Sequence, residues 1–518
     1  LTVALSTRLL GKARILQPPA ASAAMTILVL PALLAAVCLL LLLAYLQFRW
    51  RYRHVLAIAS KLSCPPTLPI LGNALLFLGE IADVTRNLKR TVVEQKGLFC
   101  LWVGPVPLFV VKDPGDLQVV LNSSSMLEKD DSYSLFKVFI GNNLITAPAH
   151  IWRKYRKLIN PVLHPSNVEH FFPVFNDVGR SLTSKLAVPA PPSDPTHHFH
   201  VMAHDAILST VVSADVNTDD VKKDLRYIIE TMGAIFIVRV FKIWLQINWL
   251  FNYIYRKELK DCFTFFDKIS DQLNNEWEKR EIIRKQTPDL LNERPTGINL
   301  LDVVFDNQPM KTEDHDWRDE LTTMTGTGSE TVVGAISFLL ITLGHYPEVQ
   351  DKIFEEIKEV MGDLERDVTP ADVTAMTYLN QVIMESIRMH GNVIMIMRKV
   401  TKDTKLSSCT LPAGSRLILH LWGMGWNEEQ FPHPNRFLPE RFSPEQQQTR
   451  HKYSFMPFSA GPRNCIGKAY AMMMMKTVLV HVLRRLTVTS HTKLSDIVYE
   501  FKLVMFSKTP LLVTFHPR

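Results

Sequence analysis

A single cysteine near the C-terminus stands in a glycine-bearing loop, directly ahead of a helix-like run. The loop reads Phe-Ser-Ala-Gly-Pro-Arg-Asn-Cys-Ile-Gly over residues 458–467, and the run 468–483 follows it. A cysteine at a helix start is stabilised as a thiolate by unsatisfied backbone N–H groups and by the positive end of the helix dipole. Gly461 and Gly467 let the backbone turn sharply and approach a flat partner closely. We therefore expect Cys465 to be a thiolate ligand.

The loop offers one ligand where most metal sites need several. Zinc and iron–sulfur sites use clustered cysteines or histidines, and none lies near Cys465 in the sequence. Arg463 supplies a forked donor that suits a propionate carboxylate. One thiolate with glycines around it and an arginine beside it indicates a haem ligand. The alternative is a buried structural cysteine. In that case the glycines and the arginine would stand beside it by coincidence.

The loop matches the signature F-x-x-G-x-R-x-C-x-G at Phe458, Gly461, Arg463, Cys465 and Gly467. The chain thereby resembles the cytochrome P450 monooxygenases of the microsomal animal type, within the family-four branch of fatty-acid hydroxylases and insect proteins. The resemblance implies a mainly α fold with small β-sheets, in which a triangular helical domain surrounds a buried haem b. Cys465 would be the axial iron ligand, with its thiolate favouring O–O bond cleavage.

Length and composition fit one large domain behind an anchor. A length of 518 residues suggests about three domains of about 150 residues, but no low-complexity linker or internal repeat separates them. A charged fraction of 21% and a hydrophobic fraction of 47% describe a globular chain with an ample core. The net charge of +7 is spread along the sequence, and no motif predicts a nucleic-acid partner. The six scattered cysteines fit a reducing compartment.

An uncharged apolar run from Met25 to Leu46 predicts a transmembrane helix. A helix of that length spans about 33 Å, enough for a hydrocarbon core of about 30 Å. The cations Arg49, Arg51 and Arg53 follow it, so the positive-inside bias predicts a catalytic domain facing the cytosol. With the family resemblance, this predicts the endoplasmic reticulum membrane. A buried core helix or a cleaved signal is the alternative.

These features give the expected division of the chain. Residues 1–24 carry three cations and no acid, so we expect an untranslated upstream sequence with Met25 as the start, or alternatively a leader segment. Residues 25–48 would be the transmembrane anchor and 49–73 a basic, proline-rich hinge. Residues 74–518 would be the haem-thiolate monooxygenase domain.

Two further segments predict local structure. Residues 98–112 read as a β-hairpin, while most later segments show helical periodicity. The stretch 233–255 is rich in large apolar residues and favours buried core. The alternative is a second surface that dips into the membrane, where Arg239 and Lys242 would accompany interfacial aromatics.

Three side chains outside the cysteine loop resemble the haem-propionate ligands of the family. Trp152 and Arg156 are four residues apart and share one helical face. They match the family's W-x-x-x-R motif, which implies that both donate to a propionate. Arg398, in the strand-like stretch 393–400, is a candidate for the same role, as is Arg463. Alone, W-x-x-x-R would more often mark a surface arginine.

A predicted ion triad has a structural role. Glu385 and Arg388 lie three residues apart on the helix expected over 378–390, and Arg441 stands in a Pro-Glu-Arg-Phe segment. They resemble the family's E-x-x-R and P-E-R-F motifs, which implies a brace beneath the cysteine loop. A buried triad of this kind fixes geometry more than it stabilises the fold.

The distal side is expected on a long helix over 317–344. There Gly328, Glu330 and Thr331 resemble the family pattern A-G-x-D/E-T-T/S. The resemblance implies that Gly328 leaves room for dioxygen, that Thr331 holds an oxygen species or a water, and that Glu330 passes protons inward. In isolation, such residues would more often be core packing.

Three departures from the family pattern stand out. Thr327 replaces alanine at the first position of the distal motif, and Val332 replaces a hydroxyl residue at the last. Some family-four members carry a glutamate at the first position that esterifies haem, so Thr327 argues against that covalent link. Met424-Gly425 stands where many members have a His-Arg pair, which puts one haem or proximal contact in doubt.

The sequence therefore predicts a monooxygenase that inserts one oxygen atom into a lipophilic substrate such as a fatty acid, hormone, pheromone or xenobiotic. The chain shows no dinucleotide or flavin fingerprint, so NADPH-derived electrons must come from a separate flavoprotein reductase, with cytochrome b5 as a further candidate partner. Basic residues near the cysteine are candidates for docking it: Lys154, Lys157, Arg450, Lys452 and Lys468. The alternatives are a reductase-independent haem-thiolate isomerase or dehydratase, and a non-enzymatic haem-bound ligand sensor.

Overall fold

The computed structural model describes residues 20–213, 218–286, 297–307, 312–313 and 315–518. The chain divides into two units, residues 1–57 and residues 58–518. Most of the predicted leader, residues 1–19, lies outside the described residues.

The first unit is built on one long helix, α1 (Ala20–Arg51). Its part Pro31–Arg51 is apolar and long enough to cross a membrane, and it is not buried inside the protein. Exposed leucines along this stretch have no protein core to pack against, which is compatible with membrane anchoring. The last turn of α1 contains Arg49 and Arg51, and Arg53 begins the next, short helix, α2 (Arg53–Ala59).

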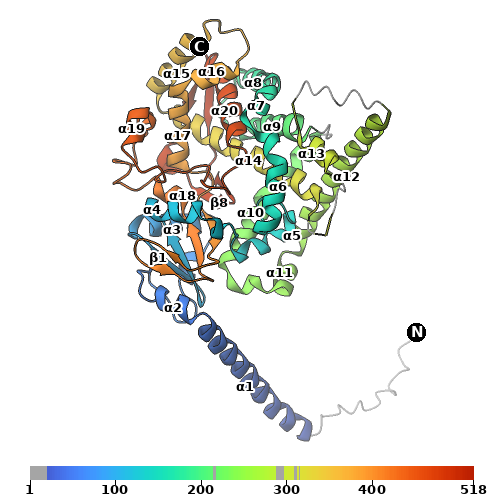
Figure 1. Cartoon of the computed structure of the whole chain (residues 1–518), viewed down its shortest axis with the longest axis vertical. Helices are drawn as coiled ribbons and strands as arrows, with labels where there is room; N and C mark the ends of the chain where they lie inside the picture. The colour runs from blue at the N-terminus through green and yellow to red at the C-terminus, as the bar shows by residue number, and fades with distance from the viewer. Residues whose placement is uncertain (1–19, 214–217, 287–296, 308–311, 314) are drawn as a thin grey trace, which may run out of the picture. The chain divides into compact units, whose positions relative to one another are not determined.

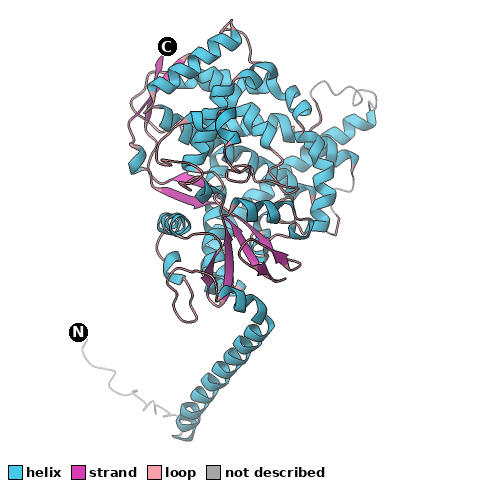
Figure 2. Ribbon diagram, turned by 60° about the vertical axis from the view of Figure 1, so that its left-hand side comes forward, coloured by secondary structure: helices cyan, strands magenta, loops and turns pink. Residues whose placement is uncertain are grey.

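The second unit is mostly helical (Figures 1 and 2). Its helices are α3 (Ile81–Glu94), α4 (Pro114–Asn122), α5 (Lys137–Ile140), α6 (Ala149–Ile159), α7 (Pro165–Val168), α8 (Phe172–Leu186), α9 (Thr196–Ile207), α10 (Thr218–Phe241), α11 (Asn248–Ile254), α12 (Arg256–Gln286), α13 (Leu300–Asp306), α14 (Trp317–Leu343), α15 (Pro347–Met361), α16 (Pro370–Ala375), α17 (Thr377–His390), α18 (Leu421–Met424), α19 (Pro444–Gln448) and α20 (Lys468–Leu483).

The strands form small sheets beside the helices. They are β1 (Phe99–Val103), β2 (Val106–Val111), β3 (Ile396–Lys399), β4 (Thr404–Lys405), β5 (Thr410–Leu411), β6 (Arg416–Leu419), β7 (Leu486–Ser490), β8 (Tyr499–Lys502), β9 (Val504–Ser507) and β10 (Val513–Pro517). The largest described sheet has the order β1-β2-β6-β3, in which only the β2–β6 pair is parallel. The β1–β2 hairpin confirms the one predicted over 98–112.

Helix α14 runs through the interior of the domain and packs against α9, α17 and α20 (Figure 1). Asp316 caps its first turn by accepting a hydrogen bond from the backbone N–H of Arg318, and Asp319 and Glu320 add negative charge near the helix N-terminus. Most of its later side chains are buried. Although α14 is long and apolar enough to cross a membrane, this burial makes it a core helix.

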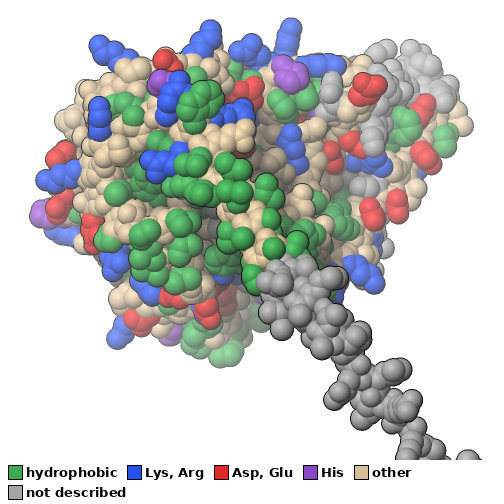
Figure 3. All heavy atoms as spheres, turned by 90° about the horizontal axis from the view of Figure 1, so that it is seen from below, with side chains coloured by type: hydrophobic (Ala, Val, Ile, Leu, Met, Phe, Trp, Pro, Cys, Tyr) green, Lys and Arg blue, Asp and Glu red, His purple; other side chains and the backbone are tan. Residues whose placement is uncertain are grey.

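The apolar stretch 233–255 divides between core and surface. Phe236, Val240 and Phe251 are buried, whereas Trp249 and Tyr253 of α11 are exposed. Helix α11 lies at the lower end of the domain in Figure 1, and Figure 3 shows apolar side chains gathered on the face seen from below. The stretch is therefore buried core in part, as favoured from the sequence, and exposed aromatic residues stand at its α11 end.

Arg239 does not lie among interfacial aromatics, where the membrane-dipping alternative placed it. Its guanidinium is buried, where Nε donates to the backbone oxygen of Leu245 at 3.1 Å and Nη2 donates to Asn248 Oδ1 at 2.6 Å. The group also lies 3.8 Å from the ring centroid of Phe251. Arg239 thus holds the turn between α10 and α11 from inside, because these backbone and amide oxygens satisfy its donors.

Candidate functional site

The cysteine loop closes on itself ahead of α20. The backbone N–H of Cys465 donates to the carbonyl oxygen of Phe458 at 2.9 Å, and the N–H of Asn464 donates to that of Gly461 at 3.1 Å. Gly461 has a φ of 71°, and a Cβ there would lie 2.0 Å from the backbone oxygen of Leu121. Only glycine fits this position, since both the backbone conformation and the space exclude a side chain.

Cys465 itself stands three residues before Lys468, the first residue of α20. Its side chain is exposed in the structure, so its thiol is accessible. Desolvation by the surrounding protein raises the pKa of the Cys465 thiol, and the Gly467 N–H, Arg156 and Lys468 offset only part of this rise. A donor N–H and two nearby cations are the surroundings that favour a thiolate.

Arg463 lies buried beside the loop with unused donors. Its Nη2 donates to the backbone oxygen of Ala147 at 2.8 Å, and its guanidinium lies 4.7 Å from the ring centroid of Trp152. The Nε and Nη1 groups are buried without a hydrogen-bond partner among the described residues. Two buried donors of this kind indicate a ligand that carries its own acceptors.

Two more cations accompany Arg463. Arg398 on β3 is buried, and Lys129 pairs with it through an isolated β-bridge. Burial and the neighbouring Arg398 lower the pKa of Arg463 to about 9. Burial, Arg398 and Arg463 also lower the pKa of Lys129 well below its ordinary value. Three cations that repel one another favour an anionic partner.

One acidic group lies near this cluster. Glu128 is close enough to act on Arg463 electrostatically, but both of its carboxylate oxygens accept hydrogen bonds from the backbone N–H of Ala149, at 3.1 and 3.2 Å. Lys129 was not predicted as a site residue from the sequence. Its only sequence signal is its place in an acidic stretch, which does not reveal the β-bridge that brings it to Arg398.

Trp152 and Arg156 lie on α6, but they make different contacts. Trp152 is buried and packs against Arg463. Arg156 donates through Nη1 to the backbone oxygen of Asn464 at 2.9 Å and through Nη2 to Asn464 Oδ1 at 2.8 Å. Its third donor, Nε, contacts Asn160 Oδ1 at 2.8 Å. The structure therefore directs Arg156 to the residue before the cysteine, where it fastens α6 to the loop.

The predicted ion triad is assembled in the interior. Arg388 donates to both Glu385 oxygens, from Nε at 2.7 Å and from Nη2 at 2.9 Å, and neither side chain is exposed. Arg441, in the short helix η9 (Pro439–Phe442), donates to Glu385 Oε1 at 3.2 Å. The backbone N–H of Leu438 donates to the same oxygen at 2.9 Å. The carboxylate thus joins α17 to the segment that leads toward the cysteine loop.

Gly425 belongs to this proximal network. Arg388 Nη1 donates to the Gly425 backbone oxygen at 2.7 Å, and a Cβ at Gly425 would lie 2.8 Å from Arg388 Cγ. The Met424-Gly425 departure therefore makes room for the arginine of the triad. Met424 is buried beside it.

On α14, two hydroxyl residues one turn apart share an open face. Thr327 is exposed and Thr331 is half-buried. Thr331 Oγ1 donates to the backbone oxygen of Thr327 at 3.0 Å, and Thr327 Oγ1 donates to that of Thr323 at 2.7 Å. Asn392 Nδ2 donates to the Thr331 backbone oxygen at 2.7 Å. Val332, at the position of the second hydroxyl in the family pattern, is buried instead.

Gly328 faces a neighbouring helix. A Cβ at Gly328 would lie 2.6 Å from Ile207 Cδ1 and 3.0 Å from Ile207 Cγ1, on α9. The missing side chain lets α9 approach α14, a reason for glycine that the sequence did not predict.

Glu330 also turns toward α9. It is buried, and its Oε1 lies 3.1 Å from His200 Nδ1 and 3.6 Å from His204 Nε2. Neither histidine was predicted as a site residue, because nothing in the sequence signals which face of α9 meets α14.

These residues fit a thiolate-ligated, doubly anionic macrocycle. The accessible Cys465 thiol is suited to ligate a metal, and the two unused Arg463 donors suit a carboxylate. A Cβ built on Gly467 would meet no atom within 4 Å, so the side of the loop next to the thiol is open to a flat partner. Haem, with its iron and two propionates, has this combination of groups.

Comparison with known proteins gives the same class. The family model described as cytochrome P450 matches residues 62–515, so the chain belongs to the cytochrome P450 family. "Cytochrome P450 4V2" of Homo sapiens is 29% identical over 450 residues, 84% of this chain and 86% of that protein. "Cytochrome P450 4c21" of Blattella germanica is 30% identical over 481 residues, 90% of this chain and 95% of that protein. "Cytochrome P450 4g1" of Drosophila melanogaster is 29% identical over 535 residues, 94% of each.

These relatives confirm the predicted family-four branch and the mainly helical P450 fold. The protein is an oxidoreductase of the haem monooxygenase class, with haem b held by a cysteine thiolate, and it takes NADPH-derived electrons from a redox partner. Its substrates are dioxygen and a lipophilic molecule. The apolar α1 is consistent with a membrane-anchored enzyme.

Proposed function

We propose that this protein is an endoplasmic reticulum monooxygenase whose haem iron is bound by Cys465. The observation that carries the proposal is the accessible Cys465 thiol in a well-defined loop. Backbone hydrogen bonds, the conformation of Gly461 and the contact with Arg156 hold this loop in one conformation. When bound, the haem supplies the reductive activation of dioxygen. Everything else the chain contributes is positioning, proton supply and exclusion of water.

Arg463, Arg398 and Lys129 are proposed to bind the haem propionates, with Trp152 packed beneath Arg463. Their support is the cluster of buried positive charge and the unused donors of Arg463. Arg156 acts through Asn464, which stands between Arg463 and Cys465 in the chain. Phe458, Gly461 and Gly467 shape the loop, while Glu385, Arg388 and Arg441 hold the backbone beneath it.

On the distal side, Thr331 and Glu330 are proposed as the hydroxyl and the carboxyl that move protons. Thr331 shares the open face of α14 with Thr327, and its hydroxyl can order a water there. Glu330 points toward α9, so protons reach its carboxylate from the side of His200. Gly328 supports this arrangement by admitting Ile207 between the two helices.

The exposed basic residues near the cysteine loop and the apolar helix α1 support the proposed protein and membrane partners. A membrane flavoprotein reductase, assisted by cytochrome b5, would dock near the cysteine loop on the exposed cations Lys154, Lys157, Lys452 and Lys468. Arg450 is not among them, because it packs 4.5 Å from the ring centroid of Phe431, and burial lowers its pKa to about 10. The helix α1 and the arginines after it support a bilayer anchor with the domain on the cytosolic side.

Reconstitution tests the function directly. Full-length protein is combined with NADPH, a flavoprotein reductase and phospholipid, and fatty acids, hormones, pheromone-like chains and xenobiotics are screened for oxygenated products. NADPH consumption coupled to product formation is expected for the wild type and not for Cys465→Ser. Product without NADPH would instead mark an isomerase or dehydratase, and reversible ligand binding without product would mark a sensor. In the wild type, the carbon monoxide difference spectrum of the reduced protein should show the thiolate-haem band, and C465S should lose it.

A further inference from the structure

Two histidines of α9 and one carboxylate of α14 meet in the interior of the domain. His200 and His204 are one helical turn apart, and Glu330 faces them. Their side chains are 4%, 1% and 2% exposed. One potential ligand atom from each residue lies within 4.8 Å of the other two.

The distances suit coordination by one ion. In a tetrahedral zinc site with ligands about 2.0–2.1 Å from the metal, neighbouring ligand atoms are about 3.3–3.4 Å apart. Glu330 Oε1 lies 3.1 Å from His200 Nδ1 and 3.6 Å from His204 Nε2, on either side of that value. The two imidazole centroids are 6.1 Å apart with the ring planes at 31°, and residues four apart on a helix lie on the same face.

The buried Glu330 carboxylate also favours a bound cation. A buried carboxylate is stable only when it is paired, and Glu330 contacts two histidines in the ion pairs of the described residues. A neutral imidazole nitrogen serves as a metal ligand but brings no charge of its own. Two polar atoms, His200 Nε2 and Glu330 Oε2, are buried without a hydrogen-bond partner in the described part of the chain. A divalent ion would compensate the carboxylate, and Glu330 Oε2 or a water could complete its coordination.

We propose that His200, His204 and Glu330 form a binding site for a divalent transition metal ion of the zinc type. Two imidazole nitrogens and one carboxylate oxygen are a ligand set that zinc, cobalt and nickel bind well. The site joins α9 to α14 at the level where Ile207 already fills the space beside Gly328. It does not depend on the function proposed above. A metal ion here would, however, hold the carboxylate proposed to move protons.

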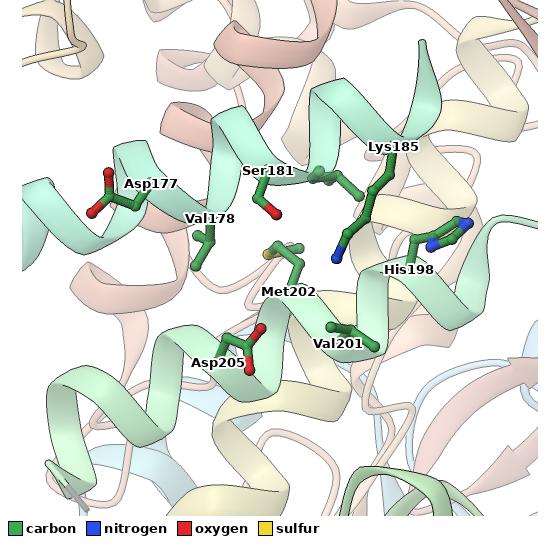
Figure 4. A pocket seen from close by; sticks show the side chains of 9 residues that line it. Asp177, Val178, Ser181, Lys185, His198, Val201, Met202 and Asp205 are labelled. Carbon is green, nitrogen blue, oxygen red and sulfur yellow. The ribbon is translucent and has the colours of Figure 1, made fainter. Parts of the chain in front are cut away.

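The nearby surface pocket is a separate feature. It has a volume of about 190 Å³ and lies between α8 and α9, with His198 and Asp205 of α9 in its lining (Figure 4). These residues project from a different side of α9 than His200 and His204, because neighbouring positions on a helix are turned by about 100°. His197 and His198 are exposed, so the same helix provides matched control histidines outside the cluster.

Zinc content of the haem-loaded, full-length protein tests the site. Purified protein is incubated with two equivalents of zinc sulfate and desalted, and zinc and iron are measured by mass spectrometry. The wild type and the double control His197→Gln/His198→Gln are expected to retain about one zinc per haem. His204→Gln and His200→Gln should retain at least tenfold less. Equal zinc in the wild type and H204Q would overturn the proposal.

A second measurement covers variants that fail to fold. Zinc K-edge X-ray absorption of the wild type with one equivalent of zinc should show two imidazole shells and an oxygen shell. A zinc ion without imidazole ligands, or with six oxygens, would overturn the proposal whatever the variants do.

Measurements of enzyme turnover distinguish the proposed metal site from the proposed monooxygenase function. Zinc should slow the wild type and leave H204Q unaffected, whereas an inactive protein that still binds zinc through two imidazoles would contradict only the monooxygenase proposal.

Discussion

Arg156 Nη2 lies 2.8 Å from Asn464 Oδ1, and its Nη1 lies 2.9 Å from the backbone oxygen of the same residue. One guanidinium therefore holds both the side chain and the backbone of the residue before Cys465. The planar fork makes this two-point contact possible, and a lysine ammonium cannot reproduce it.

Replacing Arg156 is expected to loosen haem binding. Arg156→Lys and Arg156→Leu lose at least one hydrogen bond from a charged donor, which is worth about 1.5–3 kcal/mol, so haem should dissociate at least about tenfold faster. The rate is measured by transfer of haem to excess apomyoglobin. Arg153→Leu, an exposed change on the same helix, is the control. If R156L and R153L released haem equally slowly, the contact with Asn464 would have no part in holding the loop.

The conformation of the cysteine loop and the Glu385–Arg388 ion pair have local signals in the sequence. The loop is continuous in sequence, and Glu385 and Arg388 are three residues apart on one helix, so their contact follows from helical geometry alone. Helix α20 begins and ends at the residues that the apolar run predicted. Arg441 was placed through its motif and reaches Glu385 across 56 residues.

Contacts set by helix packing were not predictable in the same way. Which face of α9 meets α14 depends on the whole tertiary arrangement, so neither the approach of Ile207 to Gly328 nor that of His200 to Glu330 has a local signature. Lys129 reaches the cation cluster through one β-bridge to Arg398, between segments distant in sequence. Arg239 would lie at a surface in the membrane-dipping alternative for 233–255, but the Leu245 and Asn248 oxygens and the Phe251 ring hold it in the core.

The loop should not tolerate a side chain at Gly461. Gly461→Ala requires a positive φ, which costs roughly 1–2 kcal/mol, and it also places a Cβ against the Leu121 backbone oxygen, which cannot move aside easily. We expect a loss of more than about 3 kcal/mol and poor haem incorporation. The midpoint for thermal loss of the Soret band measures this effect.

Gly362 offers a matched control for that change. It has a φ of 65°, yet a Cβ there would meet nothing within 4 Å. Gly362→Ala therefore carries only the backbone cost, roughly 1–2 kcal/mol. A G461A protein as stable as G362A would show that the approach to Leu121 relaxes at little cost.

The buried carboxylate of the triad should be far more sensitive than a surface one. Glu385→Gln leaves Arg388 in the interior without its charge partner, which should destabilise the protein by roughly 3–5 kcal/mol. Glu440→Gln weakens an exposed pair with Lys352 and should cost less than about 1 kcal/mol. Both are measured by denaturant unfolding followed through tryptophan fluorescence and Soret absorbance. Similar midpoints for E385Q and E440Q would contradict a brace built on this carboxylate.

The close approach of α9 to α14 should appear as coupling between Gly328 and Ile207. Gly328→Ala gains about 1 kcal/mol of helix propensity but forces a methyl group against Ile207 Cδ1, and such overpacking costs about 1–3 kcal/mol. Ile207→Val removes that methyl end, at a cost of about 0.5–1.5 kcal/mol by itself. In the double variant the alanine fits, so its instability should be smaller than the sum of the single changes by about 1 kcal/mol or more. Unfolding midpoints of the four proteins give this coupling directly. Strictly additive changes would mean that α9 shifts away from α14 instead of pressing against Gly328.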